Sequence, residues 1–444
     1  MCRGVADAQQ TSSSVDEPNG PWTLERCIEY AKAHNVQLEK ARITGLQAVE
    51  DVAQQKAGLL PSLSFSTNHN VSWRPWSQSF VNLSSGTMTT TSSEVNYNGS
   101  YGLNANLTVW NGGRNVMNID RSREELKLSV LDLSRQELDL QEQILKLYVQ
   151  TLYTNEAIGV CHQSLEASKL QRDRARVMVD VGNLAKVDLA QLESQVSQDE
   201  YNVVNAQTQL ANCKLQLMQQ LQLVCLVEDF DVVIPSIDDS KILKTLPPLS
   251  DVVAYATSQR PEIQSAMVNQ DIAVLDRKIA RRAYLPTVNL TAGMGTNNSS
   301  GVHKDIQKQW KNNLNNSLGL TISVPILDNR QTKTSVNKAV LRQLSASADY
   351  SDAVLQLKTK IENYYMDAQT AQQQYRYAKA NVEAMQQSYN LVSEQFKLGL
   401  KNIVELNTGK NNLLQAQQQL LESKYTALMA RALVNYYNGE NIKL

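Results

Sequence analysis

A run of 69 residues without glycine or proline, from Arg330 to Leu398, limits what this chain can fold into more than any other feature. The run is rich in Gln, Leu, Ala, Lys and Glu, which favour the helix. At about 1.5 Å per residue, one helix over this run would be roughly 100 Å long, far beyond an ordinary globular helix. A second run, from Arg114 to Val181, is interrupted only by Gly159. We therefore expect two very long helices.

Each long run is followed by a glycine and then by a second helical segment in which an apolar residue recurs every seven positions. The first segment carries Leu189, Val196, Val203, Leu210 and Leu217, and the second carries Leu406, Leu413, Leu420, Ala427 and Val434, each 217 positions later. A seven-residue apolar period predicts helices that supercoil around one another. The matching register also indicates an internal duplication.

Earlier segments repeat as well. The segment 57–61 is answered by 282–286 at an offset of 225, whereas Gly102 and Gly319 differ by 217. The difference places an insertion of eight residues between Pro61 and Gly102. The intervening Ser/Thr-rich composition is typical of an exposed loop.

These offsets divide the chain into four parts. The parts are an N-terminal extended segment at 1–21, a first repeat at 22–229, a linker at 230–248 and a second repeat at 249–444. In the first repeat we expect strands at about 62–73 and 95–110 and a helical hairpin with its tip near 182. In the second repeat we expect strands at about 286–296 and 314–327 and a tip near 399.

The four strand segments alternate between apolar residues and Asn, Ser or Thr. Alternation alone suits a half-buried sheet in a water-soluble domain equally well. The polar faces carry hardly any charge, however, and each segment is about long enough to span a bilayer when tilted. Aromatic residues gather toward the strand ends, as in interfacial girdles, at Trp73, Trp76, Tyr97, Tyr101 and Trp110. The pattern therefore favours a membrane barrel with an apolar exterior.

Four strands are too few for such a barrel. In hydrocarbon a sheet must close so that no edge is left unpaired, and the smallest membrane barrels have about eight strands. Several copies of the chain must therefore contribute strands. A dimer, a trimer and a tetramer all satisfy this argument.

Composition excludes several other classes. The formal net charge is −1, so a basic nucleic-acid surface is not expected. No stretch of 18 apolar residues predicts a transmembrane helix. The four histidines and five cysteines lack metal-site spacing, and no phosphate loop, dinucleotide fingerprint or nucleophile elbow is found. We expect no metal, no cofactor and no catalytic activity.

The N-terminus carries no apolar stretch typical of a secretory signal, and only Met1 precedes Cys2. If the protein is exported, we expect this numbering to begin at or near the mature end.

Taken together, these features resemble the TolC family of outer-membrane efflux proteins over nearly the whole chain. The resemblance rests on the opening Trp22-Thr23-Leu24 with Asn35 in the helix that follows, the Leu-Pro ends before the strands, the duplication, and the glycine turns at 181–188 and 398–405. It implies a mainly α fold with a transmembrane β-barrel portion. In such a fold, a trimer forms a 12-stranded β-barrel that continues as a 12-helix α-barrel.

The resemblance also implies the function. The expected role is a passive channel in the bacterial outer membrane, with its helical part in the periplasm, serving as exit duct of a tripartite efflux or type I secretion system for small molecules or proteins. An inner-membrane pump supplies the energy. A periplasmic adaptor protein docks on the hairpin tips, which here contain Gly182, Asn183, Leu184, Gly399 and Leu400.

Three charged residues match positions at the closed periplasmic mouth of the family, namely Asp188, Lys401 and Glu405. Three copies of Glu405 would form a carboxylate ring. The family pattern has a second acidic residue where this chain has Thr408, so the ring would be weaker or differently built. A solvated helix face is the alternative for Glu405. Cys2 matches the lipid-bearing N-terminus of many members, and a plain thiol is its alternative.

Two other classes explain part of the pattern. A soluble periplasmic coiled-coil scaffold or adaptor accounts for the helices, and a pore-forming toxin accounts for strands that insert into a membrane. The scaffold does not account for four uncharged alternating strands or for a duplication that includes them, and a toxin would insert its strands only at the target membrane. Membrane fractionation separates these classes, because a resident channel is found in the outer membrane.

Overall fold

The computed structural model describes residues 21–73, 78–82, 87–91, 95–235, 242–300 and 305–444. Cys2 and Trp76 lie outside these residues. The chain divides into two compact units, each of which draws on both sequence repeats. The helical unit comprises Met1–Ile43, Leu131–Gln264 and Ser351–Leu444, and the sheet unit comprises Thr44–Val130 and Ser265–Tyr350.

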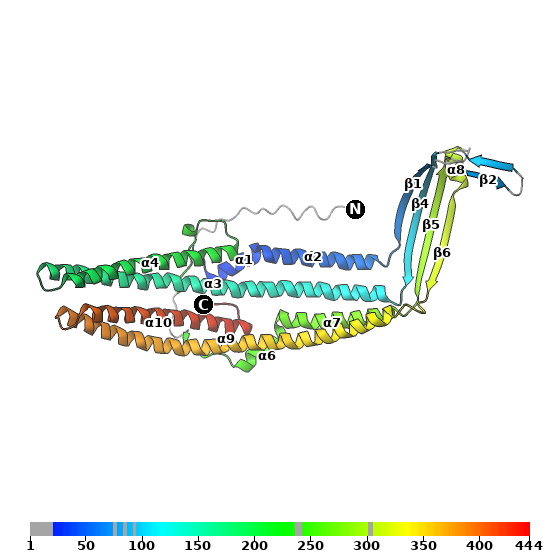
Figure 1. Cartoon of the computed structure of the whole chain (residues 1–444). Coiled ribbons are helices and arrows are strands. Elements are labelled where there is room, and N and C mark those ends of the chain that lie inside the picture. Colours follow the sequence, from blue (N-terminus) through cyan, green and yellow to red (C-terminus); the bar gives the residue numbers. More distant parts are fainter. Residues whose placement is uncertain (1–20, 74–77, 83–86, 92–94, 236–241, 301–304) are drawn as a thin grey trace. The chain divides into compact units, whose positions relative to one another are not determined.

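The first repeat contains, in chain order, α1 (Leu24–His34), α2 (Val36–Ala57), β1 (Ser62–Trp73), β2 (Gln78–Asn82), β3 (Thr87–Thr91), β4 (Val95–Trp110), α3 (Arg114–Asp180) and α4 (Lys186–Leu221). A short 3₁₀ helix, η2 (Val227–Asp229), ends the first repeat. The second repeat contains α6 (Leu249–Gln259), α7 (Pro261–Arg282), β5 (Thr287–Ser299), α8 (Ile306–Asn312), β6 (Asn315–Ser323), α9 (Gln331–Lys397) and α10 (Ile403–Tyr437). Apart from β2, β3, α8 and η2, the element order is the same in both repeats (Figure 1), which confirms the duplicated strand-strand-long-helix arrangement.

The two longest helices, α3 and α9, have 67 residues each. They run in the same direction, and side chains 218 positions apart in sequence bond to each other at two levels. Lys360 Nζ donates to Glu142 Oε2 at 3.1 Å, and Gln171 Nε2 donates to the Tyr389 hydroxyl at 2.5 Å. The duplicated helices therefore lie nearly in register within the helical unit.

Each repeat also breaks its first helix pair at an equivalent residue. Asn35 separates α1 from α2, and its side chain donates to the carbonyl of Gln220 near the end of α4 at 3.1 Å. Arg260 separates α6 from α7, and its guanidinium carbon lies 4.0 Å from the ring centre of Tyr437 at the end of α10. Pro261 accounts for the second break, since proline lacks a backbone N–H. In both repeats the break is thus anchored on the end of the last helix.

The sheet unit contains a four-stranded antiparallel sheet in the order β1-β4-β5-β6, with β4 and β5 joining the two repeats. On the apolar face, Phe65, Leu318 and Leu320 of the edge strands are exposed, whereas Leu107 and Leu290 of the central strands are half-buried. The other face carries Asn, Ser and Thr, paired across strands as in Asn68 with Ser100. In the connection between β5 and β6, the side chain of Gln309 in α8 bonds to both backbone groups of Ser299 in β5.

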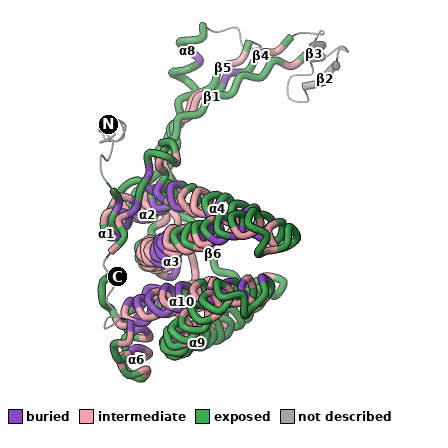
Figure 2. Tube along the Cα trace, turned by 90° about the vertical axis from the view of Figure 1, so that its left-hand side faces the viewer, coloured by how far each residue is buried: buried purple, intermediate pink, exposed green. Residues whose placement is uncertain are grey.

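The core of the helical unit follows the helix seams instead of forming one central mass. Figure 2 shows buried residues running along α10, whereas the strands of the sheet unit are mostly exposed or half-buried. None of the helices in the described part of the chain combines the length and the apolar character needed to cross a membrane.

Candidate functional site

The two hairpin tips use the same backbone turn. At the first tip, Gly182 N–H donates to Val179 O at 3.0 Å and Asn183 N–H donates to Met178 O at 2.8 Å. At the second tip, Gly399 and Leu400 make the equivalent bonds, both at 2.9 Å. This pair of bonds is the Schellman motif, which requires a left-handed residue after the helix. Gly182 has φ of 81° and Gly399 has φ of 72°, which is why glycine is needed at both tips.

The two tips differ in how the following helix begins. At the second tip, Asn402 Oδ1 accepts from Glu405 N–H at 2.9 Å, and Glu405 Oε2 accepts from Asn402 N–H at 3.2 Å. These reciprocal bonds form a capping box. At the first tip the equivalent N-cap is Ala185, which has no side-chain acceptor. Of the two equivalent acidic residues, Asp188 and Glu405, only the glutamate caps its helix.

The candidate gate residues are only partly brought together. Lys401 Nζ donates to Glu405 Oε1 at 2.5 Å, so these two form an ion pair on the surface of the second tip. The hydrogen bond from Lys401 and that from the Asn402 N–H hold the pKa of Glu405 below its usual value. Asp188 is half-buried, and it forms no ion pair with any of the described residues. Thr408 donates its hydroxyl to Val404 O at 2.8 Å, an ordinary helix contact.

A small apolar core lies directly behind the tips and joins the two hairpins. Its buried members are Ala175, Leu192, Ile403 and Leu406, with Leu184, Leu189, Tyr389, Val392 and Phe396 packed against them. Leu184 is therefore half-buried in this core, whereas the other tip residues proposed for docking, Gly182, Asn183, Gly399 and Leu400, are exposed. The apolar Val181, Val187, Leu398 and Val404 are exposed around them. The tips thus present an apolar surface on a packed base.

Above this core lies a buried polar cluster that the sequence analysis missed. Lys410 of α10 donates to Asp199 of α4 and to Ser168 of α3, and the Ser168 hydroxyl donates to Asp199 Oδ2 at 2.5 Å. Asp199 lies on the same stripe as Val196 and Val203, and Lys410 lies between the stripe residues Leu406 and Leu413. The sequence did contain a signal for this cluster, because Asp199 and Lys410 place opposite charges in two otherwise apolar stripes.

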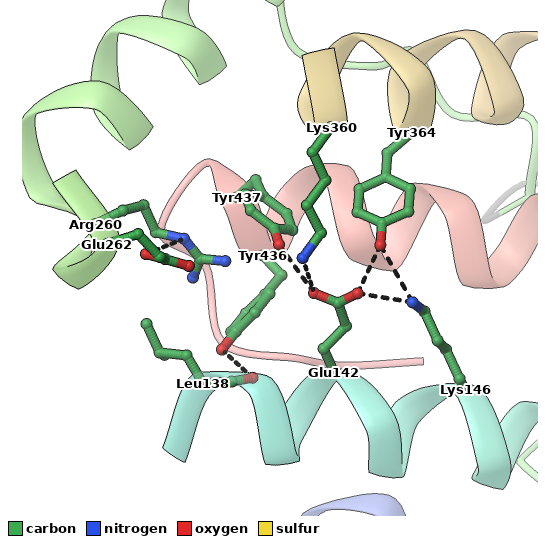
Figure 3. Close-up of polar contacts among 9 residues, drawn as sticks. All are labelled: Leu138, Glu142, Lys146, Arg260, Glu262, Lys360, Tyr364, Tyr436 and Tyr437. Carbon is green, nitrogen blue, oxygen red and sulfur yellow. Dashed lines mark hydrogen bonds and ion pairs between the residues drawn. The ribbon is translucent and has the colours of Figure 1, made fainter. Parts of the chain in front are cut away.

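A second buried cluster lies where α3, α9 and α10 meet (Figure 3). Glu142 accepts from Lys146 at 2.7 Å, from the Tyr364 hydroxyl at 2.6 Å and from the Tyr437 hydroxyl at 2.9 Å, besides the bond from Lys360. Burial opposes ionisation of Glu142, but these donors prevail and lower its pKa to about 2. The sequence did not mark Glu142, because its partners other than Lys146 are more than 200 positions away.

The polar face of the sheet borders a cavity of about 550 Å³ beside α8. Its lining consists of Asn, Ser, Gln and Gly residues, among them Asn68, Asn98 and Asn297, and contains no charged residue. No group of His, Cys, Asp and Glu residues suited to a metal ion occurs in the described ranges. The chemistry of this face is neutral hydrogen bonding.

Comparison with known proteins decides the family. The family described as outer membrane efflux protein matches residues 27–221 and 252–437, most of the chain and both of its repeats. The chain belongs to the outer membrane efflux protein family. The match covers both helical hairpins, and the gap between its two segments falls on the residues that connect the repeats.

Relatives and solved structures agree with this assignment. The chain is 22% identical over 94% of its length to toxin and drug export protein A of Aggregatibacter actinomycetemcomitans, covering 87% of that protein. It is 24% identical over 74% of its length to outer membrane protein TolC of Escherichia coli, covering 72% of that protein. The structure of the CmeC outer membrane channel of Campylobacter jejuni matches with a TM-score of 0.77 and 18% identity, covering 95% of this chain and 87% of that one.

The family membership confirms three expectations from the sequence. The resemblance to TolC-type proteins, the mainly helical fold with a barrel-forming sheet, and the role of an outer-membrane export channel are all correct. The family is a channel family and not an enzyme family. This outer membrane efflux protein is therefore an exit duct of the outer membrane, and the scaffold and toxin alternatives are disfavoured.

Proposed function

We propose that three copies of this chain form one passive exit duct, which a periplasmic adaptor protein connects to an inner-membrane pump. In this assembly the 12 strands contributed by three subunits close a barrel in the outer membrane. The helical hairpins continue the duct into the periplasm. The pump supplies the energy, and the cargo is a small molecule or a protein.

The observation that carries this proposal is that the four-stranded sheet of one chain has unpaired edges and an uncovered apolar face. Its edge strands, β1 and β6, each pair with only one neighbour among the described strands. Its apolar face is uncovered, with Leu320 62% exposed. Open edges and a bare apolar face are both unstable in a monomer, and both are satisfied when sister sheets pair edge to edge within lipid.

Two adjacent residues of β6 provide a matched test. Leu320 lies on the apolar face and Thr321 on the polar face, and both are exposed in the single chain. Leu320→Arg should block assembly in the outer membrane, because an arginine facing lipid costs about 2–4 kcal/mol near the bilayer centre. Thr321→Arg should assemble normally, because its side chain would face water inside the duct. Outer-membrane fractionation and heat-sensitive trimers on unboiled gels are the measurements.

If the two arginine variants assemble equally well, Leu320 does not face lipid, and the proposed barrel is wrong. A particle of two or four subunits by native mass spectrometry would instead correct the subunit number alone.

The tips support the docking part of the proposal. Leu400 is 71% exposed, and the exposed valines and leucine around it form an apolar surface that has no cover in the single chain. Exposed apolar surface at the end of a rigid hairpin suits a protein partner better than water. We assign this surface to the adaptor, with Gly182, Asn183, Gly399 and Leu400 at its centre.

Leu400→Asp should abolish export in cells while leaving the trimer intact, whereas Leu400→Met should export normally because it keeps an apolar side chain of similar size. Accumulation of a fluorescent pump substrate in cells measures the loss. Normal export by the aspartate variant would show that the adaptor does not use Leu400.

A further inference from the structure

The two hairpins of the helical unit are joined above the tips by a contact with unusual chemistry. Lys410 is 3% exposed and Asp199 is 1% exposed, and they belong to different hairpins. They lie 11 residues beyond Gly399 and 17 beyond Gly182, so the contact is roughly 20 Å along the helices from the turns. Both occupy helix stripes that are otherwise apolar.

The bonding of this contact is asymmetric. Asp199 also accepts from two residues of its own hairpin, from Ser168 and, at 3.1 Å, from Gln195 Nε2. Among the described residues, Lys410 has two partners, Ser168 and Asp199, and both lie on the opposite hairpin. If the hairpins move apart, Asp199 keeps part of its bonding and Lys410 loses these two partners together. The lysine is thus satisfied in one arrangement of the hairpins.

A buried polar pair in a helix seam specifies one register, because other arrangements leave a charge without a partner. Apolar side chains at the same two positions would tolerate a range of small displacements. The pair therefore makes closure of the second hairpin on the first an all-or-none state. The Lys410–Asp199 pair lies between the apolar core at the tips and the rest of the seam. Any separation of the two hairpins that extends beyond the tips must therefore break this pair.

We propose that Lys410 and Asp199, with Ser168, are gating residues of the duct that hold the two hairpins of each subunit closed above the mouth. This inference rests on the proposed function as a duct. It adds a second, buried closing contact to the exposed pair Lys401–Glu405. The internal repeat argues that the contact is specific to this pair of positions, since the equivalent of Asp199 is Ala416 and the equivalent of Lys410 is Glu193.

The chain offers a matched control. Lys424, also in α10, donates to Glu156 of α3 at 2.9 and 3.0 Å, and so also links the two hairpins. Its side chain is 21% exposed and that of Glu156 is 40% exposed, so water can replace the partner. An exposed ion pair contributes little to stability, whereas removal of one partner of a buried pair leaves an unsolvated charge.

The test measures single-channel conductance in planar bilayers for Lys410→Met, Asp199→Asn and Lys424→Met. We expect the first two to raise the open-channel population by at least about tenfold. Lys424→Met should behave as the wild type. The double variant Lys410→Leu/Asp199→Leu should close again, because no buried charge remains. Wild-type conductance in Lys410→Met and Asp199→Asn, with trimers assembled, would overturn the inference.

A second measurement does not depend on conduction. Cysteines at Leu192 and Leu406, in the core shared by the two hairpins, report closure by their yield of oxidative cross-linking in detergent, in a background without the native cysteines. Lys410→Met should lower this yield and Lys424→Met should not. If the wild-type protein does not conduct but the two variants still differ in cross-linking yield, the proposed duct is rejected and the closing contact between the hairpins stands. Equal cross-linking yields in both variants would reject the contact. This outcome can be read even from a variant that fails to form trimers, because both cysteines belong to one subunit.

Discussion

The two hairpin tips share one backbone and differ in what their side chains do. Both end the long helix in the same Schellman turn at a glycine with positive φ. At the second tip, Asn402 and Glu405 cap α10, and Glu405 pairs with Lys401. At the first tip, the N-cap Ala185 offers no side-chain bond to α4, and Asp188 is half-buried without an ion pair among the described residues. Duplication therefore preserved the turn geometry, while the charges of the two tips acquired different roles.

The largest expected difference between the tips is in conduction. Lys401→Ala together with Glu405→Ala should raise single-channel conductance several-fold if the second tip closes the mouth, because the charged groups are then lost from the constriction. Asp188→Ala should change conductance less, since Asp188 forms no ion pair with the described part of its own subunit. Planar-bilayer recordings of both variants make the comparison. A larger effect from Asp188→Ala would move the gate to the first tip.

The turns themselves should respond alike. Gly182→Ala and Gly399→Ala each place a side chain at positive φ, which costs roughly 1–2 kcal/mol. Among the described residues, no atom beyond the neighbouring residues of the chain lies within 4 Å of the added methyl group at either position, so the cost is strain in the backbone. Hydrogen exchange of the amides at each tip measures the loss. Unequal losses would show that the shared geometry hides a different environment.

The helix starts should respond in opposite directions. Asn402→Ala removes the cap of α10 and should destabilise its first turn by about 1 kcal/mol. Ala185→Asn, combined with Asp188→Glu, writes the same capping box into the first tip and should stabilise the first turn of α4 by a similar or smaller amount. The backbone of Ala185 is already extended, as an N-cap requires. Exchange protection of the first helical turns is the readout.

Acid should destabilise the helix start at the second tip only, and this is the smallest of the expected effects. The pKa of Glu405 is lowered in the folded protein, so its contribution is fully present above the unfolded value near 4.5 and is lost as the pH falls through the lower folded value. Protection at the start of α10 should therefore decline below about pH 4.5. In Glu405→Gln the same amides should show no such decline. A decline that persists in the glutamine variant would assign the effect to another group.

Sequence periodicity predicted much of this fold, because the helices and strands are long and regular. One run without glycine, a second run interrupted only by Gly159 and two matched apolar stripes were enough to predict long helices, a duplication and a supercoiled core. Uncharged alternating strands predicted a barrel-forming sheet. Its local signals also include Asn402 and Glu405, whose spacing is that of a capping box. These features depend on residues that are close in sequence, and local chain geometry translates them directly into structure.

What only the tertiary structure decided is which distant charges meet. Glu142 lies with Lys360, Tyr364 and Tyr437, and Asp199 lies with Lys410, across more than 200 positions of sequence. A charge in an apolar stripe looks like a defect until its partner is placed beside it by the parallel register of the repeats. The sequence by itself determined the elements and their order, because those follow from local periodicity, and the packing of one repeat on the other determined which buried charges are paired.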